Sequence, residues 1–258
     1  VAGPGTGKTK TLVPRILYLL ESRKVRPCQI TAVTFTNQAA GELRERIAAG
    51  LGKGRNVRQM QIGTFHAICL ELLKRAGMDF TLADEMQTME AAEQVTQRCG
   101  LKMAPGEFLR RVSNRKAGLC QEEPEGFSEA YEAYQAYLDS MRLLDFDDLL
   151  LQALSYMETE QGQKAEGGRF SYLLVDEFQD SSPLQYRLMK AWNQGGREVF
   201  VIGDPDQSIY GFRGSDAACF ERLAQDFEGL KTIRLVQNYR SVPAVTESAV
   251  CLIDKNPG

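Results

Sequence analysis

Residues 2–9 read AGPGTGKT and fit the phosphate-binding pattern A/G-x-x-x-x-G-K-S/T, which decides how the rest of the chain is interpreted. The glycines allow backbone N–H groups to turn toward phosphate oxygens, and the helix predicted behind them adds the positive end of its dipole. Lys8 is expected to reach the β- and γ-phosphates of ATP, and Thr9 to place a hydroxyl on Mg²⁺. The residues predicted to contact the nucleotide here are Gly3, Gly5, Thr6, Gly7, Lys8, Thr9 and Lys10.

The stretch YLLVDEFQD, residues 172–180, supplies the second half of such a site. Four apolar residues lead into Asp176 and Glu177, as expected for a buried strand that ends in two carboxylates. A carboxylate at this end of a strand beside the phosphate loop is where Mg²⁺ is held. We expect Asp176 to bind the metal and Glu177 to orient and deprotonate the attacking water, which points to ATP hydrolysis.

Short apolar runs rich in Val, Ile and Phe alternate with helical patterns along most of the chain. The runs at 29–35, 60–65, 171–177, 198–204 and 231–235 are predicted as strands, and helices are predicted at 8–22, 37–49, 65–76, 182–193 and 216–227. Strands that alternate with helices imply a mainly parallel sheet covered on both faces. The predicted fold class is therefore α/β.

Residues 78–141 interrupt this alternation, because they contain helical spacing and no convincing strand. We interpret them as an all-helical insertion. Tyr131, Tyr134 and Tyr137 fall on one face at three-residue spacing, which favours a place in its core. Residues 162–168, GQKAEGG, are predicted to form a surface loop.

The composition is ordinary for a globular protein: 258 residues, 43% hydrophobic, 25% charged, net charge −3. No apolar run approaches the ~20 residues of a membrane span, and no signal peptide is visible. The six cysteines form no CxxC pair, which favours free buried thiols in a reducing cytoplasm over a zinc site. A negative net charge argues against a protein coated in nucleic acid, although it allows a local basic groove.

Seven stretches, in this order, resemble the superfamily 1A DNA helicases of the UvrD/Rep/PcrA type. They are AGPGTGKT, AVTFTNQAAGELRERI, IGTFHAICLELL, FDDLL, LLVDEFQDSSPLQ, VIGDPDQSIYGFRGSD and VQNYRSV. The resemblance implies a RecA-like P-loop NTPase domain, a DNA-dependent ATPase activity and 3′-to-5′ movement. It also implies partners: single-stranded DNA and junctions of duplex and single strand.

The resemblance assigns further roles around ATP. Gln207 in DPDQS matches the family's γ-phosphate sensor, and Arg240 in NYRS matches an arginine that contacts the γ-phosphate. Tyr239 matches the residue that stacks on adenine. We expect Lys8, Glu177, Gln207 and Arg240 to be the catalytic set.

The single-strand track is assigned in the same way. The matching residues are Phe35, Thr36, Thr64, His66, Tyr210, Phe212 and Arg213. Aromatic faces accept any base, at ~1–3 kcal/mol per stacked base, which suits a motor that moves over every sequence. Gln38 stands where relatives commonly carry Lys and Phe212 where several carry Trp, two departures that would lower DNA affinity.

By this resemblance, residues 1–77 and 142–235 form the ATP-binding domain, 78–141 the helical subdomain, and 236–258 the hinge and first helix of a second RecA-like domain. We therefore expect a piece of a longer helicase that lacks its C-terminal helicase domains, and slow ATP hydrolysis without unwinding from this piece alone. Two alternatives stay open. One is the helicase subunit of a helicase–nuclease recombination complex, and the other is a non-catalytic DNA-binding remnant of the fold.

Overall fold

The computed structural model describes residues 5–52, 57–119, 122–207, 219–227 and 229–242, together with 244, 245, 248 and 251; the side chain of Thr9 is not described. The chain divides into two compact units. Unit 1 comprises Val1–Thr64, Gly167–Ser181 and Gly195–Gly258, and unit 2 comprises Phe65–Glu166 and Ser182–Gln194. Unit 2 is therefore larger than the predicted insertion 78–141, because it also includes helical residues before and after that range. The boundaries of the expected helicase domains stay a prediction.

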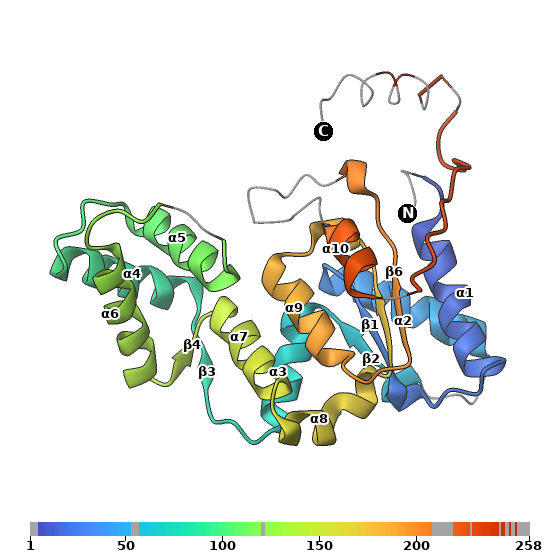
Figure 1. The fold of residues 1–258 in the computed structure, drawn as a ribbon, viewed down its shortest axis with the longest axis horizontal. Helices are drawn as coiled ribbons and strands as arrows, with labels where there is room; N and C mark the ends of the chain where they lie inside the picture. The colour runs from blue at the N-terminus through green and yellow to red at the C-terminus, as the bar shows by residue number, and fades with distance from the viewer. Residues whose placement is uncertain are drawn as a thin grey trace. The chain divides into compact units, whose positions relative to one another are not determined.

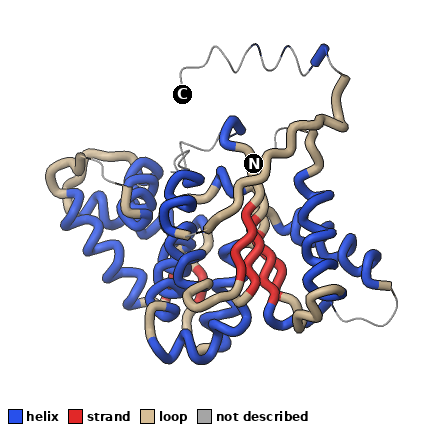
Figure 2. Tube along the Cα trace, turned by 45° about the vertical axis from the view of Figure 1, so that its right-hand side comes forward, coloured by secondary structure: helices blue, strands red, loops and turns tan. Residues whose placement is uncertain are grey.

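Four parallel strands form the sheet of unit 1 in the order β2–β1–β5–β6 (Figures 1 and 2). They are β1 (Ile30–Val33), β2 (Gln61–Gly63), β5 (Tyr172–Val175) and β6 (Glu198–Val201). Val33 lies opposite Val175, and Val175 opposite Val201. Because the strands are parallel and end in register, their carboxyl ends emerge at one edge of the sheet. The predicted α/β class with a parallel sheet is confirmed.

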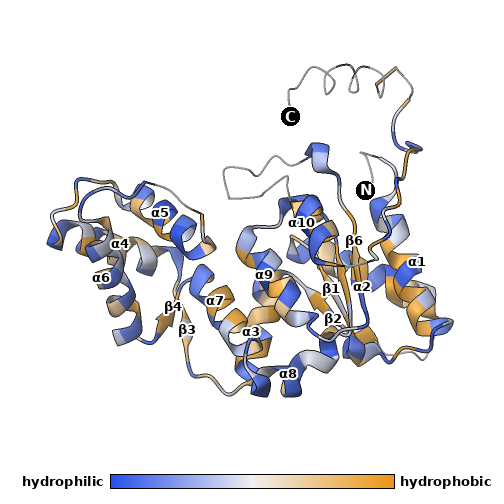
Figure 3. Ribbon diagram, in the orientation of Figure 1, coloured by the Kyte–Doolittle hydropathy of each residue, from blue (hydrophilic) through white to orange (hydrophobic). Residues whose placement is uncertain are grey.

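One face of this sheet is covered by α1 (Lys8–Glu21) and α2 (Asn37–Leu51). Leu12, Ile16 and Leu19 form a buried stripe on α1 with the spacing of a helix face. They share one apolar cluster with Ile30 and Ala32 of β1, and the strands are correspondingly hydrophobic in Figure 3. The remaining helix of unit 1 with described bounds is α10 (Cys219–Asp226); 3₁₀ turns lie at Pro27–Gln29, Val57–Gln59, Gly167–Phe170, Phe178–Asp180 and Pro205–Gln207.

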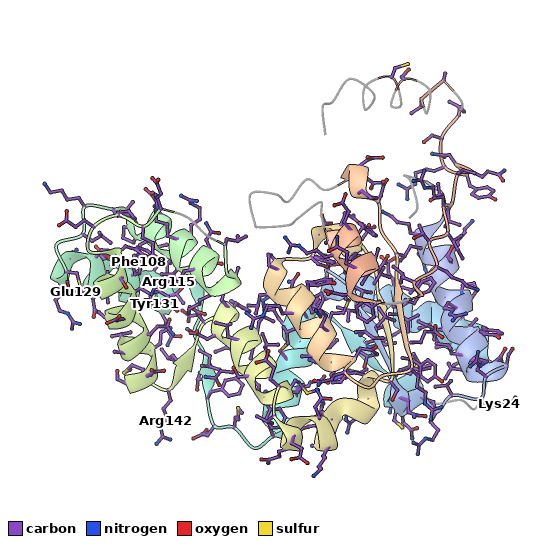
Figure 4. The ribbon with its side chains drawn as sticks, viewed as in Figure 1. Lys24, Phe108, Arg115, Glu129, Tyr131 and Arg142 are labelled. Atoms are coloured by element: carbon purple, nitrogen blue, oxygen red, sulfur yellow. The ribbon has the colours of Figure 1, made fainter. Side chains whose placement is uncertain are left out.

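Unit 2 is mainly helical. Its helices are α3 (Phe65–Arg75), α4 (Glu85–Arg98), α5 (Pro105–Ala117), α6 (Phe127–Ser140), α7 (Phe146–Met157), α8 (Glu160–Glu166) and α9 (Pro183–Trp192). Phe108, Phe127 and Tyr134 fill the core of α4–α6. Tyr134 is fully buried and Tyr131 and Tyr137 pack at the edge of this core, which confirms the tyrosine stripe. The Arg115 guanidinium covers the Tyr131 ring at 4.2 Å (Figure 4).

Three local expectations are wrong. Residues 231–235 are not a strand but an exposed segment with a single bridge residue, since they line a pocket beside β6 instead of joining its ladder. Residues 162–168 are not a loop, because Glu160–Glu166 form α8, where the buried Glu166 carboxylate accepts a hydrogen bond from Arg75 at 2.8 Å. The insertion does contain a strand: β3 (Thr81–Leu82) pairs with β4 (Leu143–Leu144), too short for a pattern to reveal.

The cysteines and the helices add two smaller findings. The described cysteines are free, as expected, but Cys28 and Cys251 are exposed, so burial holds only for Cys69 and Cys219. Of the helices in the described part of the chain, none has the length and hydrophobicity that crossing a membrane requires.

A buried ion-pair network joins α5, α6 and α7. Lys116 of α5 has a fully buried side chain, and its Nζ lies 2.6 Å from Asp145 Oδ2 and 2.7 Å from Asp148 Oδ1. Tyr134 and Gln135 of α6 donate to the same two carboxylates. Asp145 also caps α7, because its Oδ1 accepts from the Asp148 N–H at 2.8 Å. Burial and the neighbouring Asp145 raise the pKa of Asp148, and the Lys116 cation opposes this rise.

We therefore predict that Lys116→Met destabilises the protein by about 3–5 kcal/mol, because it leaves two carboxylates buried without their cation. Urea unfolding measures the change. The matched control is Lys164→Met, whose ion pair with Glu160 is exposed on both sides and whose loss should change stability by less than about 0.5 kcal/mol. Equal effects of the two substitutions would contradict the prediction.

Candidate nucleotide site

The backbone of the phosphate loop adopts positive φ angles at two of its glycines. Gly5 and Gly7 have φ values of 72° and 89°, in the left-handed region that favours glycine. Gly7 caps α1, and Lys8 is its first residue. The Gly7 carbonyl accepts from the Thr11 N–H at 3.0 Å. The N-terminus of α1 therefore follows directly from the loop, the arrangement that binds phosphate.

The two predicted acids lie at the carboxyl end of β5. The Asp176 N–H donates to the Val33 carbonyl at 3.0 Å, which continues the β1–β5 pairing beyond the last strand residue. Asp176 is buried, and its Oδ1 accepts from the Glu177 N–H at 3.0 Å. Glu177 adopts φ 46°, ψ 46°, an uncommon conformation for a residue other than glycine. Such strain is characteristic of functional positions.

The phosphate loop and these acids converge. Lys8 Nζ lies 2.5 Å from Glu177 Oε2, across 169 residues of sequence. The Lys8 side chain is 12% exposed and that of Glu177 39%. A lysine cation, an adjacent carboxylate pair and a helix N-terminus therefore share one place, which suits a nucleotide phosphate with a divalent cation.

Burial and the charge of Glu177 raise the pKa of Asp176 to about 6, and the Lys8 cation opposes this rise. Within the described residues, no three His, Cys, Asp or Glu side chains gather into a closed metal site. Magnesium does not require one, because it commonly uses one or two carboxylates and completes its shell with phosphate oxygens and water. A buried carboxylate beside the phosphate loop fits that requirement. The side chain of Thr9, the other predicted ligand, lies outside the described residues.

Gln207 connects to the site through Asp204. Its Nε2 donates to Asp204 Oδ2, and its own N–H donates to the Asp204 carbonyl at 3.0 Å. Asp204 is buried, two residues after Ile202, whose N–H donates to Val175. The structure thus brings Gln207 to the same edge of the sheet as Asp176.

The segment that carries Tyr239 and Arg240 packs on the phosphate loop. The Tyr239 N–H donates to the Gly5 carbonyl at 3.0 Å. A Cβ on Gly5 would lie 2.7 Å from Asn238 Oδ1 and 2.8 Å from Arg240 Cβ, so the contact also requires glycine at position 5. The Tyr239 side chain is 68% exposed, and Arg240 is exposed too, as is Lys10 on the first turn of α1.

The residues expected to line a DNA track lie in both units. In unit 1, Phe35 and Thr64 are half-buried beyond the ends of β1 and β2, and Thr36 caps α2 by accepting from the Ala39 N–H. In unit 2, His66 of α3 is half-buried, and burial lowers its pKa, which favours the neutral ring. The other predicted residues, Tyr210, Phe212 and Arg213, together with Gly3 of the phosphate loop, lie outside the described residues.

Phe146 lies against His66 and was not singled out from the sequence. Its side chain is 56% exposed, and its ring meets that of His66 edge-on, with centroids 5.5 Å apart. The signal was present: an aromatic residue directly after the cap Asp145 lies off the apolar face of α7 (Leu149, Leu150, Ala153). Phe146 is the first residue of FDDLL, a stretch that carries the family resemblance but to which no role was attached.

Comparison with known proteins agrees with this geometry. A model of the UvrD/REP helicase N-terminal domain family matches residues 1–228. The chain is 36% identical to the ATP-dependent DNA helicase Rep of Escherichia coli, with 100% of this chain and 41% of that protein covered. It is 35% identical to DNA helicase II of E. coli (100% and 38%) and 34% identical to the ATP-dependent DNA helicase PcrA of Leuconostoc citreum (99% and 37%). The chain thus spans about two fifths of the length of these relatives.

The raised pKa of Asp176 yields a prediction about stability. The folded chain holds this proton up to about pH 6, whereas the unfolded chain releases it near ~3.9. Between these values the folded state binds more protons, so the free energy of unfolding falls as the pH rises. Asp176→Asn removes the charge and should stabilise the protein without nucleotide by about 1–3 kcal/mol at pH 7.5 and by less at pH 4.5.

Urea unfolding at the two pH values measures this difference. Asp206→Asn, on an exposed side chain four residues after Ile202, is the matched control and should change nothing at either pH. A gain for Asp176→Asn that is equal at both pH values would contradict the cause we assign.

Proposed function

Because this chain belongs to the UvrD/REP helicase family, we propose that it is the ATP-binding motor portion of an ATP-dependent DNA helicase that moves 3′-to-5′ along single-stranded DNA. The observation that carries the proposal is the approach of Lys8 to Glu177, with Asp176 beside them. A degenerate, non-catalytic remnant would not be expected to preserve it. The predicted cytoplasmic location belongs to the same proposal, since DNA and ATP meet there.

The ion pair suggests how ATP prepares the site. Without nucleotide, Lys8 holds the Glu177 carboxylate. The β- and γ-phosphates would draw Lys8 toward themselves, since they present more negative charge than one carboxylate. Glu177 would then be released to orient the attacking water and accept its proton. The Lys8–Glu177 ion pair would therefore hold Glu177 in the nucleotide-free state and break when triphosphate binds.

The remaining residues complete the reaction. Asp176 and Thr9 would hold Mg²⁺, which supplies charge stabilisation to the phosphates when bound. Raising the local positive charge would also lower the pKa of Asp176 from about 6 and keep it ionised. Gln207 would bond the γ-phosphate and respond to its loss. Arg240, held near the loop through the Tyr239 backbone, would stabilise transition-state charge, which is worth ~10³–10⁵ in rate in comparable enzymes.

The DNA side of the proposal uses aromatic and hydroxyl groups. Phe35, His66 and Phe146 would present rings to bases, and Thr36 and Thr64 would contact the backbone. Unwinding is assigned to a longer protein, in which a second RecA-like domain opens and closes against this one as ATP is bound and hydrolysed. We propose that the ATP-binding domain comprises residues 1–77 and 142–235 and that the helical subdomain comprises 78–141. Residues 236–258 would begin the second RecA-like domain.

Two substitutions separate nucleotide binding from hydrolysis. Lys8→Ala should weaken ATP binding about 10- to 100-fold, because it removes a charge-assisted contact to phosphate. Glu177→Gln should leave ATP affinity unchanged or slightly tighter, since Lys8 loses its competing partner, and should lower turnover about 10²- to 10⁴-fold.

Fluorescent-nucleotide titration and phosphate release, with and without single-stranded DNA, measure the two effects. Lys164→Ala and Glu45→Gln, both on exposed side chains, are the controls. Equal turnover by the wild type and Glu177→Gln would remove Glu177 from the proposed role.

Phe146 provides a test of the DNA side. Phe146→Ala should weaken binding of single-stranded DNA by about 1–3 kcal/mol, whatever its sequence, because one stacking platform is lost. Phe146→Trp should retain it. Fluorescence anisotropy with a labelled oligonucleotide measures binding, and Met86→Ala, on another exposed apolar side chain of unit 2, is the control. An unchanged affinity for Phe146→Ala would exclude Phe146 from the track.

A further inference from the structure

Gln179, the fourth residue of DEFQD, is 2% exposed. Its side-chain amide has no role in the proposed reaction. Both ends of that amide are used. Its Nε2 donates to Glu177 Oε2 at 2.9 Å, and its Oε1 accepts from the Asp204 N–H at 2.9 Å. Gln179 therefore bridges the acid after β5 and the loop after β6.

The neighbouring chain is shaped to admit this side chain. A Cβ on Gly203 would lie 2.4 Å from Gln179 Oε1 and 3.0 Å from the Phe178 backbone nitrogen. The Phe178 N–H meanwhile donates to the Ile202 carbonyl at 3.0 Å, which brings the two loops together. Glycine at 203 is thus required by contact and not by its own turn, because any side chain there would expel the amide.

The bridge continues to the predicted γ-phosphate sensor. Asp204 accepts from the Asp206 N–H at 3.2 Å and from the Gln207 amide. One chain of hydrogen bonds consequently runs from Lys8 through Glu177, Gln179 and Asp204 to Gln207. It connects the acid that would activate water with the amide that would detect the phosphate.

Lys8 and Gln179 contact the same oxygen, Glu177 Oε2. If ATP draws Lys8 away, Gln179 is left as the donor on that oxygen, and Oε1 stays free to face water. We propose that Gln179 is the positioning residue of Glu177, which holds its carboxylate after Lys8 has moved and ties its orientation to Gln207. This inference rests on the proposed ATPase function and adds a residue to it.

Substitutions at Gln179 test the two ends of the amide separately. Gln179→Met has a similar length and loses both hydrogen bonds. Gln179→Glu keeps an acceptor for the Asp204 N–H but loses the donor to Glu177 and repels it. For both, kcat should fall about 10- to 100-fold while KM for ATP stays within about threefold. Stimulation of turnover by single-stranded DNA should also shrink, because the connection to Gln207 is broken.

Gly203→Ala perturbs the same bridge without changing Gln179, and should lower kcat in the same way. The matched control is Gly168→Ala, since a Cβ there has nothing within 4 Å. A wild-type kcat in Gln179→Met and Gln179→Glu would overturn the proposal. So would a loss of kcat that is accompanied by an equal loss of ATP affinity, which would indicate a merely structural role.

A double-mutant cycle separates this inference from the proposed function. Urea unfolding of Gln179→Met, Glu177→Gln and the double variant needs no activity. If Gln179 acts on Glu177, the two changes in stability should be non-additive. Additive changes would overturn the inference even if the protein hydrolyses ATP. A wild type that hydrolyses no ATP, with or without DNA, would instead overturn the proposed function, while the cycle would still decide whether the contact exists.

Discussion

The ion pair of Lys8 with Glu177 joins residues 169 positions apart and depends on the pairing of β1 with β5. That pairing carries Asp176 to the carboxyl edge of the sheet through its bond to the Val33 carbonyl. Gly7, in a left-handed conformation, starts α1 so that Lys8 faces the same edge. Every later feature of the site, from the Gln179 bridge to the Tyr239 segment on Gly5, is built on this convergence. A parallel sheet supplies such an edge because all its strands end together.

Several groups at this edge of the sheet lower the free energy of unfolding. Asp176 is a buried carboxylate, Glu177 adopts a conformation that side chains disfavour, and Gln179 is a buried amide. A bound cation would favour the ionised form of Asp176, and hydrogen bonds at both ends already satisfy the Gln179 amide. Stability given up at a site in this way is a usual consequence of arranging charge for chemistry.

Unit 2 uses buried charge for a different purpose. The Lys116 network fixes the first turn of α7 against α5 and α6, because Asp145 is both a partner of Lys116 and the cap of α7. Phe146 directly follows that cap and points its ring toward His66 and solvent. The ionic cluster therefore also places the aromatic pair that we assign to single-stranded DNA. An apolar core at this position could give equal stability but would not cap the helix.

The sequence by itself determined the α/β class, the phosphate loop, the carboxylates after β5 and the family, because each depends on a contiguous pattern of residue types. It did not determine that 231–235 line a pocket beside β6 with a bridge at Leu235 alone, or that Glu160–Glu166 form a helix held by Arg75. It also did not reveal that Gln179 and Lys116 are buried, because glutamine and lysine are usually surface residues. Only the tertiary structure decided these, since each contact depends on a partner that is distant in the chain, such as Asp204 for Gln179, Asp145 for Lys116 and Arg75 for Glu166. Burial and hydrogen bonding over such separations are properties of the folded chain, and no local pattern encodes them.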